Sequence, residues 1–133
     1  RPKIQYINQE YFDYLDVSES SLKFIREAMY SVVNEYKGTA FSSRLASKYK
    51  LVGKTGTSQV RKITMSERES GVLKNEEIAY KLRDHSIFTG FAPYKNPKYA
   101  ITVVAEHMGS GSKIAAPIAK KITEFSLKKF LKT

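Results

Sequence analysis

The sequence predicts an α+β fold in which one helix precedes three antiparallel strands and a second helix follows them. Apolar residues recur at helical spacing near both ends of the chain, and three strand-like segments lie between these regions. The last two strand-like segments are joined by a short run that contains two prolines, which predicts a hairpin. At 133 residues the chain fits one domain.

The first helix is expected at residues 19–36, after a short extended lead-in at residues 4–7. Ser18 can cap its N-terminus, and Gly38 is placed as its C-terminal stop. Apolar side chains at helical spacing predict a buried stripe: Leu22, Ile25, Met29, Val32, Val33 and Tyr36.

The first strand is expected within residues 49–60, where Leu51 and Val52 suit a half-buried sheet. A charged stretch without periodicity at residues 62–75 predicts a mobile loop. The later elements are a short helix at 75–82, hairpin strands at 86–92 and 99–106, a glycine-rich break at 109–112 and a helix at 114–131. That last helix carries an apolar side made of Ile118, Ile122, Phe125 and Phe130.

The net charge of +10, from 23 basic and 13 acidic residues, would favour anionic partners. Several basic residues cluster late in the chain: Lys120, Lys121, Lys128, Lys129 and Lys132. A solvated helix face explains them better than a nucleic-acid patch, because no RNA-binding signature or helix-turn-helix pattern accompanies them. The absence of cysteine excludes disulfides and thiolate zinc sites.

The run from Lys54 to Thr57, Lys-Thr-Gly-Thr, is the candidate site. Gly56 would weaken an ordinary strand, so a ligand or another backbone is expected to approach it. The neighbouring cation and the hydroxyls of Thr55 and Thr57 can bind a carboxylate and polarise a carbonyl. A phosphate-binding loop is excluded, because that motif needs a glycine where this chain has Lys48.

Other short elements occur in a fixed order around this run. They are Asn34-Glu-Tyr-Lys-Gly-Thr-Ala40, Leu82-Arg-Asp-His85, Ala92-Pro-Tyr-Lys-Asn-Pro97, Gly109-Ser-Gly111 and Ala115-Ala-Pro-Ile118. Together they resemble the C-terminal part of the transpeptidase domain of class B penicillin-binding proteins. The Arg-Asp-His and Ala-Pro-Tyr-x-Asn-Pro elements are most similar to the penicillin-binding protein 2 branch, which acts in cell elongation. The resemblance covers most of residues 15–130 and is poorest at 62–71.

This resemblance implies a serine D,D-transpeptidase that cross-links peptidoglycan stem peptides through an acyl-enzyme and binds β-lactams. It implies catalytic roles for Lys54, which organises the cleft electrostatically, and for Thr57, whose backbone N–H is an oxyanion-hole donor. The hydroxyls of Thr55 and Thr57 would bind the substrate carboxylate, and Gly56 would let the substrate lie along the strand. No cofactor and no metal are expected.

The resemblance also implies a parent protein that is anchored in the bacterial inner membrane and works on its periplasmic face. Its expected partners are the stem peptide, β-lactams and a glycan polymerase of the elongation machinery, but no nucleic acid. Residues 1–133 are expected to be the C-terminal part of the domain, without the anchor. The sheet would then lack neighbours, so we expect the isolated chain to self-associate, as a dimer or by exchanging an element between copies.

Enzymes of this family use Ser-x-x-Lys, Ser-x-Asn and Lys-Thr-Gly in chain order. Ser20-Ser-Leu-Lys23 and Ser47-Lys-Tyr-Lys50 match the first motif formally, and Tyr6-Ile-Asn8 imitates a variant of the second. The order is wrong, however, because Tyr6-Ile-Asn8 precedes both serines and no Ser-x-Asn lies between Ser20 and Lys54. We therefore expect the nucleophile to be missing and the isolated chain to be inactive.

Two other functions remain open. A small basic, non-enzymatic module that binds an anionic polymer would need only the net charge and the late lysines. A miniature hydrolase would use Ser20 or Ser47. His85 and His107 have no further ligand at metal-binding spacing, so His85 is expected to be a structural hydrogen-bonding residue.

Overall fold

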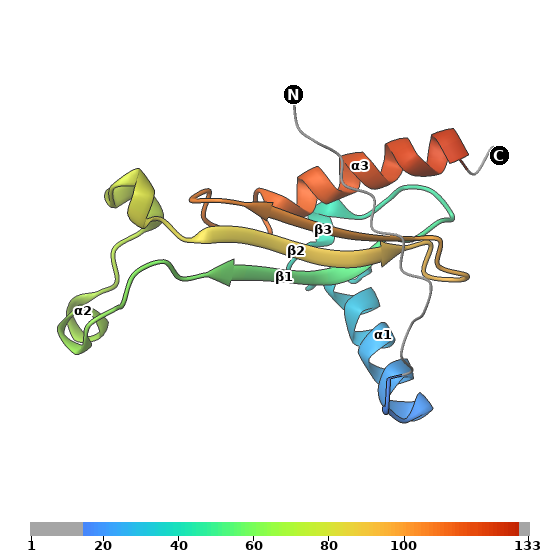
Figure 1. Ribbon diagram of the computed structural model, residues 1–133, viewed down its shortest axis with the longest axis horizontal. Helices are drawn as coiled ribbons and strands as arrows, with labels where there is room; N and C mark the ends of the chain where they lie inside the picture. Colours follow the sequence, from blue (N-terminus) through green and yellow to red (C-terminus); the bar gives the residue numbers. More distant parts are fainter. Residues whose placement is uncertain (1–14, 131–133) are drawn as a thin grey trace.

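The computed structural model describes residues 15–130, which form a three-stranded antiparallel sheet with a long helix on either side (Figure 1). The helices and strands are α1 Glu19–Asn34, β1 Val52–Ser58, α2 Met65–Ser70, β2 His85–Ala92, β3 Tyr99–Ala105 and α3 Ala115–Phe130. The predicted α+β fold is confirmed. The predicted lead-in at residues 4–7 and the Tyr6-Ile-Asn8 run lie outside the described residues.

The strand order β1-β2-β3 leaves β1 at one edge of this sheet. Its register with β2 places Lys54 opposite Thr89 and Thr57 opposite Ser86. An edge strand has one row of backbone N–H and C=O groups turned away from its neighbour. The Lys-Thr-Gly run is therefore placed where an extended peptide can lie beside it.

The core lies between the sheet and α3 and extends to the end of α1 and to the connection that leads into β1, through Val33, Ala40, Leu45 and Leu51. Phe88 of β2 is its largest fully buried side chain, and Ala92 lies further along the same strand. The side of α3 that meets the sheet is made of small residues followed by one leucine: Ala115, Ala116, Ala119 and Leu127. Because alanine is small, the helix backbone packs close to the sheet.

Helix α1 begins as predicted, since the Ser21 N–H donates to Ser18 Oγ at 3.2 Å. It ends at Asn34 instead of residue 36, and its C-cap residue has an extended conformation. Gly38 is needed for a different reason than the predicted helix stop. A Cβ atom on Gly38 would lie 2.3 Å from the Val32 carbonyl oxygen, so only glycine lets the chain pass the end of α1.

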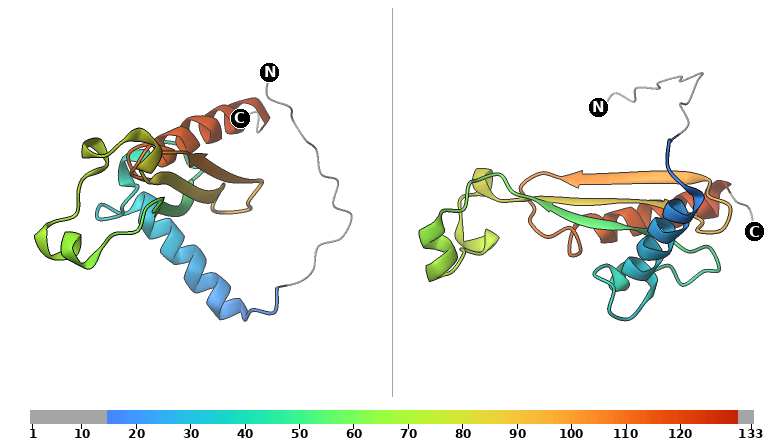
Figure 2. Two further views of the ribbon diagram at one scale, coloured as in Figure 1. Left: turned by 60° about the vertical axis from the view of Figure 1, so that its left-hand side comes forward. Right: turned by 90° about the horizontal axis from the view of Figure 1, so that it is seen from below.

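The predicted buried stripe of α1 is confirmed at Val33, which is fully buried, and at the half-buried Met29 and Val32, but it is wrong at Leu22, Ile25 and Tyr36. The predicted stripe of α3 is wrong at its three described residues, and the Phe130 side chain lies outside the described part. Residues 19–25 of α1 are all exposed, because this end of the helix projects away from the sheet (Figure 2). In α3, the alanine side faces the sheet, while Ile118, Ile122 and Phe125 are exposed. Both helices thus carry apolar side chains that nothing in residues 15–130 covers. Within the same range, no helix is long and apolar enough to span a bilayer.

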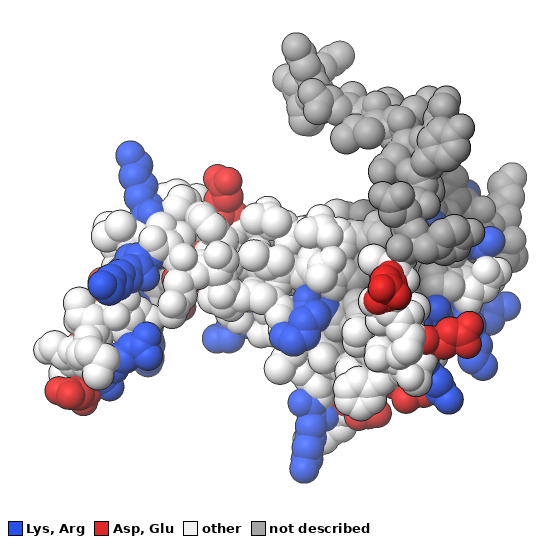
Figure 3. All heavy atoms as spheres, turned by 60° about the horizontal axis from the view of Figure 1, so that its bottom comes forward, with Lys and Arg blue, Asp and Glu red and all other residues white. Residues whose placement is uncertain are grey.

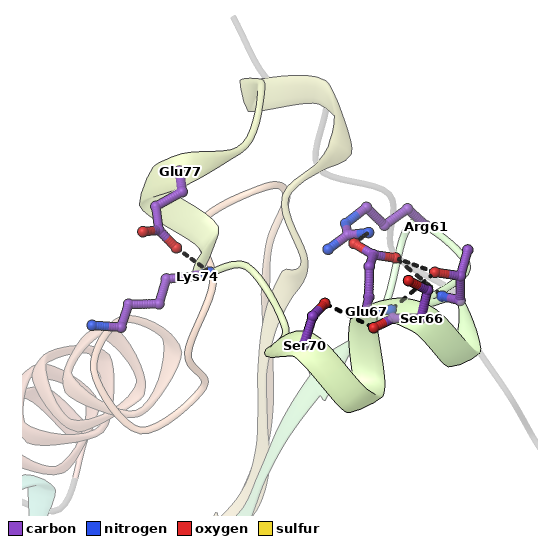
Figure 4. A network of polar contacts seen from close by, with 7 residues as sticks. Arg61, Ser66, Glu67, Ser70, Lys74 and Glu77 are labelled. Carbon is purple, nitrogen blue, oxygen red and sulfur yellow. Dashed lines mark hydrogen bonds and ion pairs between the residues drawn. The ribbon is translucent and has the colours of Figure 1, made fainter.

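The loop expected at residues 62–75 contains the short helix α2 (Figure 4). Thr64 Oγ1 accepts from the Glu67 N–H at 3.2 Å, and Glu67 Oε2 accepts from the Thr64 N–H at 3.0 Å. Arg61 donates to the Glu67 carboxylate at 2.6 Å. Thr64-x-x-Glu67 is a capping-box signature that the aperiodic hydropathy of this stretch conceals.

The short helix expected at residues 75–82 is instead two 3-10 turns, Asn75–Glu77 and Tyr80–Leu82. The Asn75 side chain does not cap a helix there. Its Oδ1 accepts from the Asp84 N–H at 2.9 Å, which ties the segment to the start of β2. The Asn75 side chain thus binds a residue nine positions along the chain instead of the first turn of a helix.

Acid should weaken α2. The hydrogen bond from the Thr64 backbone, together with Arg61, lowers the pKa of Glu67 below its ordinary 4.5. A lowered pKa means that the carboxylate stabilises the fold above the unfolded-state value and stops doing so as the pH falls through the lowered one. The secondary chemical shifts of residues 65–70, which report helix content in NMR spectra, should therefore move towards random-coil values as the pH falls below 4.5.

Glu67→Gln should remove this acid transition, and Glu69→Gln, on the same helix, should leave it in place. A transition that persists in Glu67→Gln would show that another group controls the helix.

Candidate functional site

The candidate site is the run from Lys54 to Thr57 in β1. Residues that alternate along a strand share a face, so Thr55 and Thr57 lie on one side and Lys54 and Gly56 on the other. Thr55 is half-buried, whereas Lys54 and Thr57 are exposed. Two hydroxyls on one side of an edge strand can both reach a single carboxylate.

Lys54 bends back over its own strand. Its Nζ donates to the Thr55 carbonyl oxygen at 2.7 Å. Among residues 15–130, no carboxylate forms an ion pair with this ammonium group. The positive charge is therefore available to an anionic ligand or to a group outside the described residues.

Thr39 is a site residue whose role its place in the sequence did not predict. Its Oγ1 lies 3.1 Å from Thr55 Oγ1, within hydrogen-bond distance. The signal was present, because Thr39 belongs to the Gly-Thr-Ala element that precedes the strand. A short element in a connection does not reveal which strand residue it will touch.

The backbone of Gly111 supports β1 from the α3 side. A Cβ atom on Gly111 would lie 2.3 Å from the Gly56 carbonyl oxygen and 2.4 Å from that of Ile87. The expectation that another backbone approaches Gly56 is confirmed. The steric need for glycine, however, is at 111, because a Cβ on Gly56 would meet nothing closer than Ile87 Cβ at 3.4 Å.

The hydroxyl of Ser86 holds the 109–112 loop in this place. It is fully buried in β2, opposite Thr57. It donates to the Ser110 carbonyl oxygen at 2.9 Å and accepts from the Ala115 N–H at 3.0 Å. Each polar group in this contact is satisfied, which fixes the start of α3 to the sheet behind the Lys-Thr-Gly run.

Neither serine of the formal Ser-x-x-Lys matches lies at this site. Ser20 Oγ is 3.0 Å from Ser18 Oγ, in the first turn of α1. About 14 residues of helix separate it from the end of α1 that meets the sheet, or roughly 21 Å. Ser47 Oγ donates to the Tyr49 carbonyl oxygen at 3.0 Å.

The two histidines pack against each other. The His107 N–H donates to His85 Nδ1 at 2.9 Å, and the ring centroids are 4.6 Å apart. This contact joins the start of β2 to the end of β3, as expected of a structural hydrogen-bonding residue. In residues 15–130, no three His, Cys, Asp or Glu side chains gather as a metal site would require.

Comparison with known proteins identifies the family. A model of the penicillin binding protein transpeptidase domain matches residues 1–124. The chain belongs to this family. Peptidoglycan D,D-transpeptidase MrdA of Haemophilus influenzae is 40% identical over 103 residues, which are 77% of this chain and 15% of that protein. The Salmonella typhimurium protein of the same name is 41% identical over 100 residues, 75% of this chain and 15% of that protein.

Solved structures of penicillin-binding proteins share the fold. PBP2 in the complex with MreC from Helicobacter pylori superposes with a TM-score of 0.67 at 34% identity, over 84% of this chain and 18% of that one. Pseudomonas aeruginosa PBP2 in complex with WCK 5153 gives a TM-score of 0.59 at 32% identity, over 81% of this chain and 19% of that one. The predicted resemblance to the PBP2 branch is confirmed, and the chain spans less than a fifth of these relatives.

Gly111→Ala should destabilise the 133-residue chain more than Gly56→Ala. The Gly111 substitution forces the 109–112 loop away from β1, and overpacking typically costs about 1–3 kcal/mol. Alanine at Gly56 has room and restricts the unfolded chain, so a gain of up to about 1 kcal/mol is expected. Urea unfolding of the two variants measures the difference. Equal losses, or a larger loss at Gly56, would contradict the packing described.

Proposed function

We propose that the protein containing this chain is a D,D-transpeptidase that cross-links peptidoglycan stem peptides through a serine acyl-enzyme and is acylated by β-lactams. Family membership supports the reaction class. The observation that carries the proposal for this chain is the placement of Lys54, Thr55 and Thr57 together on an open edge strand. A peptide can bind there as an added strand, with its carboxylate near a cation and two hydroxyls.

The proposed roles follow from this placement. Lys54 supplies an uncompensated positive charge to the cleft and organises proton transfer near the nucleophile. Thr55 and Thr57 donate their hydroxyls to the substrate's terminal carboxylate. Gly56 has no side chain, so the substrate can lie close to the strand. The backbone N–H of Thr57 stabilises the oxyanion.

We propose that the nucleophile comes from residues outside this sequence. Ser20 and Ser47 hydrogen-bond locally, and neither has Lys54 as a partner. The sheet face that carries Lys54 also exposes Val104 of β3, at 57% exposure, which supports a covering element that residues 15–130 do not provide. The chain is then one wall of the cleft and is inactive by itself.

The 133-residue chain should not be labelled by a fluorescent penicillin, because Ser20 and Ser47, the serines of its two Ser-x-x-Lys matches, hydrogen-bond locally and do not contact Lys54. The complete protein should be labelled, and Lys54→Ala in it should lower the acylation rate by roughly 10²–10³-fold, the size typical of removing one preorganised electrostatic group from an active site. Gel fluorescence and mass spectrometry provide the measurement. A penicilloyl adduct on Ser20 or Ser47 of the chain would contradict the proposal.

The complete protein is further proposed to be anchored in the inner membrane, to act in the periplasm and to work with a glycan polymerase of the elongation machinery. The relative from Helicobacter pylori was solved in complex with MreC, which supports a place in a protein assembly.

Binding to an anionic polymer has less support. Figure 3 turns the underside of Figure 1 forward, and on that face Lys and Arg side chains are interspersed with acidic and neutral ones and form no continuous basic patch.

The isolated chain should self-associate, because apolar side chains remain exposed on both long helices. Phe24 of α1 is 73% exposed and Phe125 of α3 is 64% exposed. Light scattering at increasing concentration should show dimers. Phe24→Ser should reduce the dimer fraction if α1 forms the contact, and Phe125→Ser should reduce it if α3 does. A monomer at all concentrations would contradict this expectation.

A further inference from the structure

The turn that follows α1 is fixed in position. The Gly38 N–H donates to the Glu35 carbonyl oxygen at 2.9 Å, and the Ala40 N–H donates to that of Val32 at 3.0 Å. Ala40 is fully buried, and Gly38 tolerates no Cβ. Thr39 lies between these two constrained residues, so its backbone has little freedom even though its side chain is exposed.

The strand that receives Thr39 is fixed to the same helix. Asn34 Nδ2, on the last turn of α1, donates to the Leu51 carbonyl oxygen at 2.8 Å, just before β1 begins. Leu51 is fully buried. The distance between the turn and β1 is therefore set at both ends, and the contact between Thr39 and Thr55 results from the packing of α1.

A bound carboxylate would decide which hydroxyl donates in the hydrogen bond between Thr39 and Thr55. A carboxylate only accepts hydrogen bonds, so a Thr55 hydroxyl that binds it must donate. Thr55 Oγ1 can then accept from its neighbour, and Thr39 Oγ1 lies 3.1 Å away. A chain of donors that ends on an anion is strengthened along its length.

We propose that Thr39 is a positioning residue for the carboxylate site: it donates to Thr55 and thereby orients the Thr55 hydroxyl towards the substrate. This inference rests on the proposed function. It assigns a role to the turn after α1, where the side chain acts through Thr55 and does not touch the reacting atoms.

The test uses the complete protein and measures its acylation rate by benzylpenicillin and by the methyl ester of benzylpenicillin. Thr39→Val keeps the shape of the side chain but removes its donor. The rate with benzylpenicillin should fall about five- to tenfold, the size of one hydrogen bond. The rate with the ester, which has no carboxylate, should not change, and Thr39→Ser should restore the rate with benzylpenicillin.

Thr102→Val is the matched control. Thr89 Oγ1 and Thr102 Oγ1 form a similar exposed pair at 2.9 Å on the hairpin. Thr89 is opposite Lys54, so the pair lies on the sheet face that carries Lys54 and not on the face of Thr55 and Thr57, and Thr102 is two strands away from β1. This variant should leave both rates unchanged. Equal losses with the acid and the ester in Thr39→Val, or no loss with either, would overturn the inference. Lys54→Ala separates the two proposals, because a normal rate in that variant would instead contradict the proposed function.

Discussion

The buried hydroxyl of Ser86 is the contact on which the rest of the site depends. It binds the Ser110 carbonyl oxygen and the Ala115 N–H at the same time. Through these bonds the 109–112 loop is held against β1, where Gly111 meets Gly56 backbone to backbone. The strand that carries Lys54 thus has a rigid support on its α3 side. A ligand that binds such a strand meets a surface that is already in place, so little ordering is needed on binding.

The second fixed support comes from α1. Asn34 and the turn at residues 38–40 hold the beginning of β1 and bring Thr39 to Thr55. One side of the strand is therefore positioned by α3 and its entry by α1. By contrast, the sheet face that carries Lys54 is open over Val104 and Thr102. This asymmetry is what a wall of a larger cleft requires, with rigidity behind the strand and room in front of it.

The apolar side chains left exposed on α1 and α3 have the same explanation. A helix stripe such as Ile118, Ile122 and Phe125 is expected to be buried in a complete domain. In residues 15–130 the sheet is already covered by the alanine side of α3, so the stripe has no neighbour. Since the chain spans 15% of the Haemophilus influenzae relative, the proposal that further parts of the protein cover these faces is consistent with both observations.

The sequence by itself determined the order of the two long helices and the three strands, the N-cap at Ser18, the hairpin and the Lys-Thr-Gly run, because each is encoded by neighbouring residues. It also contained the α2 capping box, which hydropathy concealed. Only the tertiary structure decided which helix faces are buried, why glycine is required at 38 and 111, and that Thr39 meets Thr55. These features depend on the approach of segments far apart in the chain. Periodicity reports how side chains are arranged around one element, but it does not report which neighbour is there to cover them.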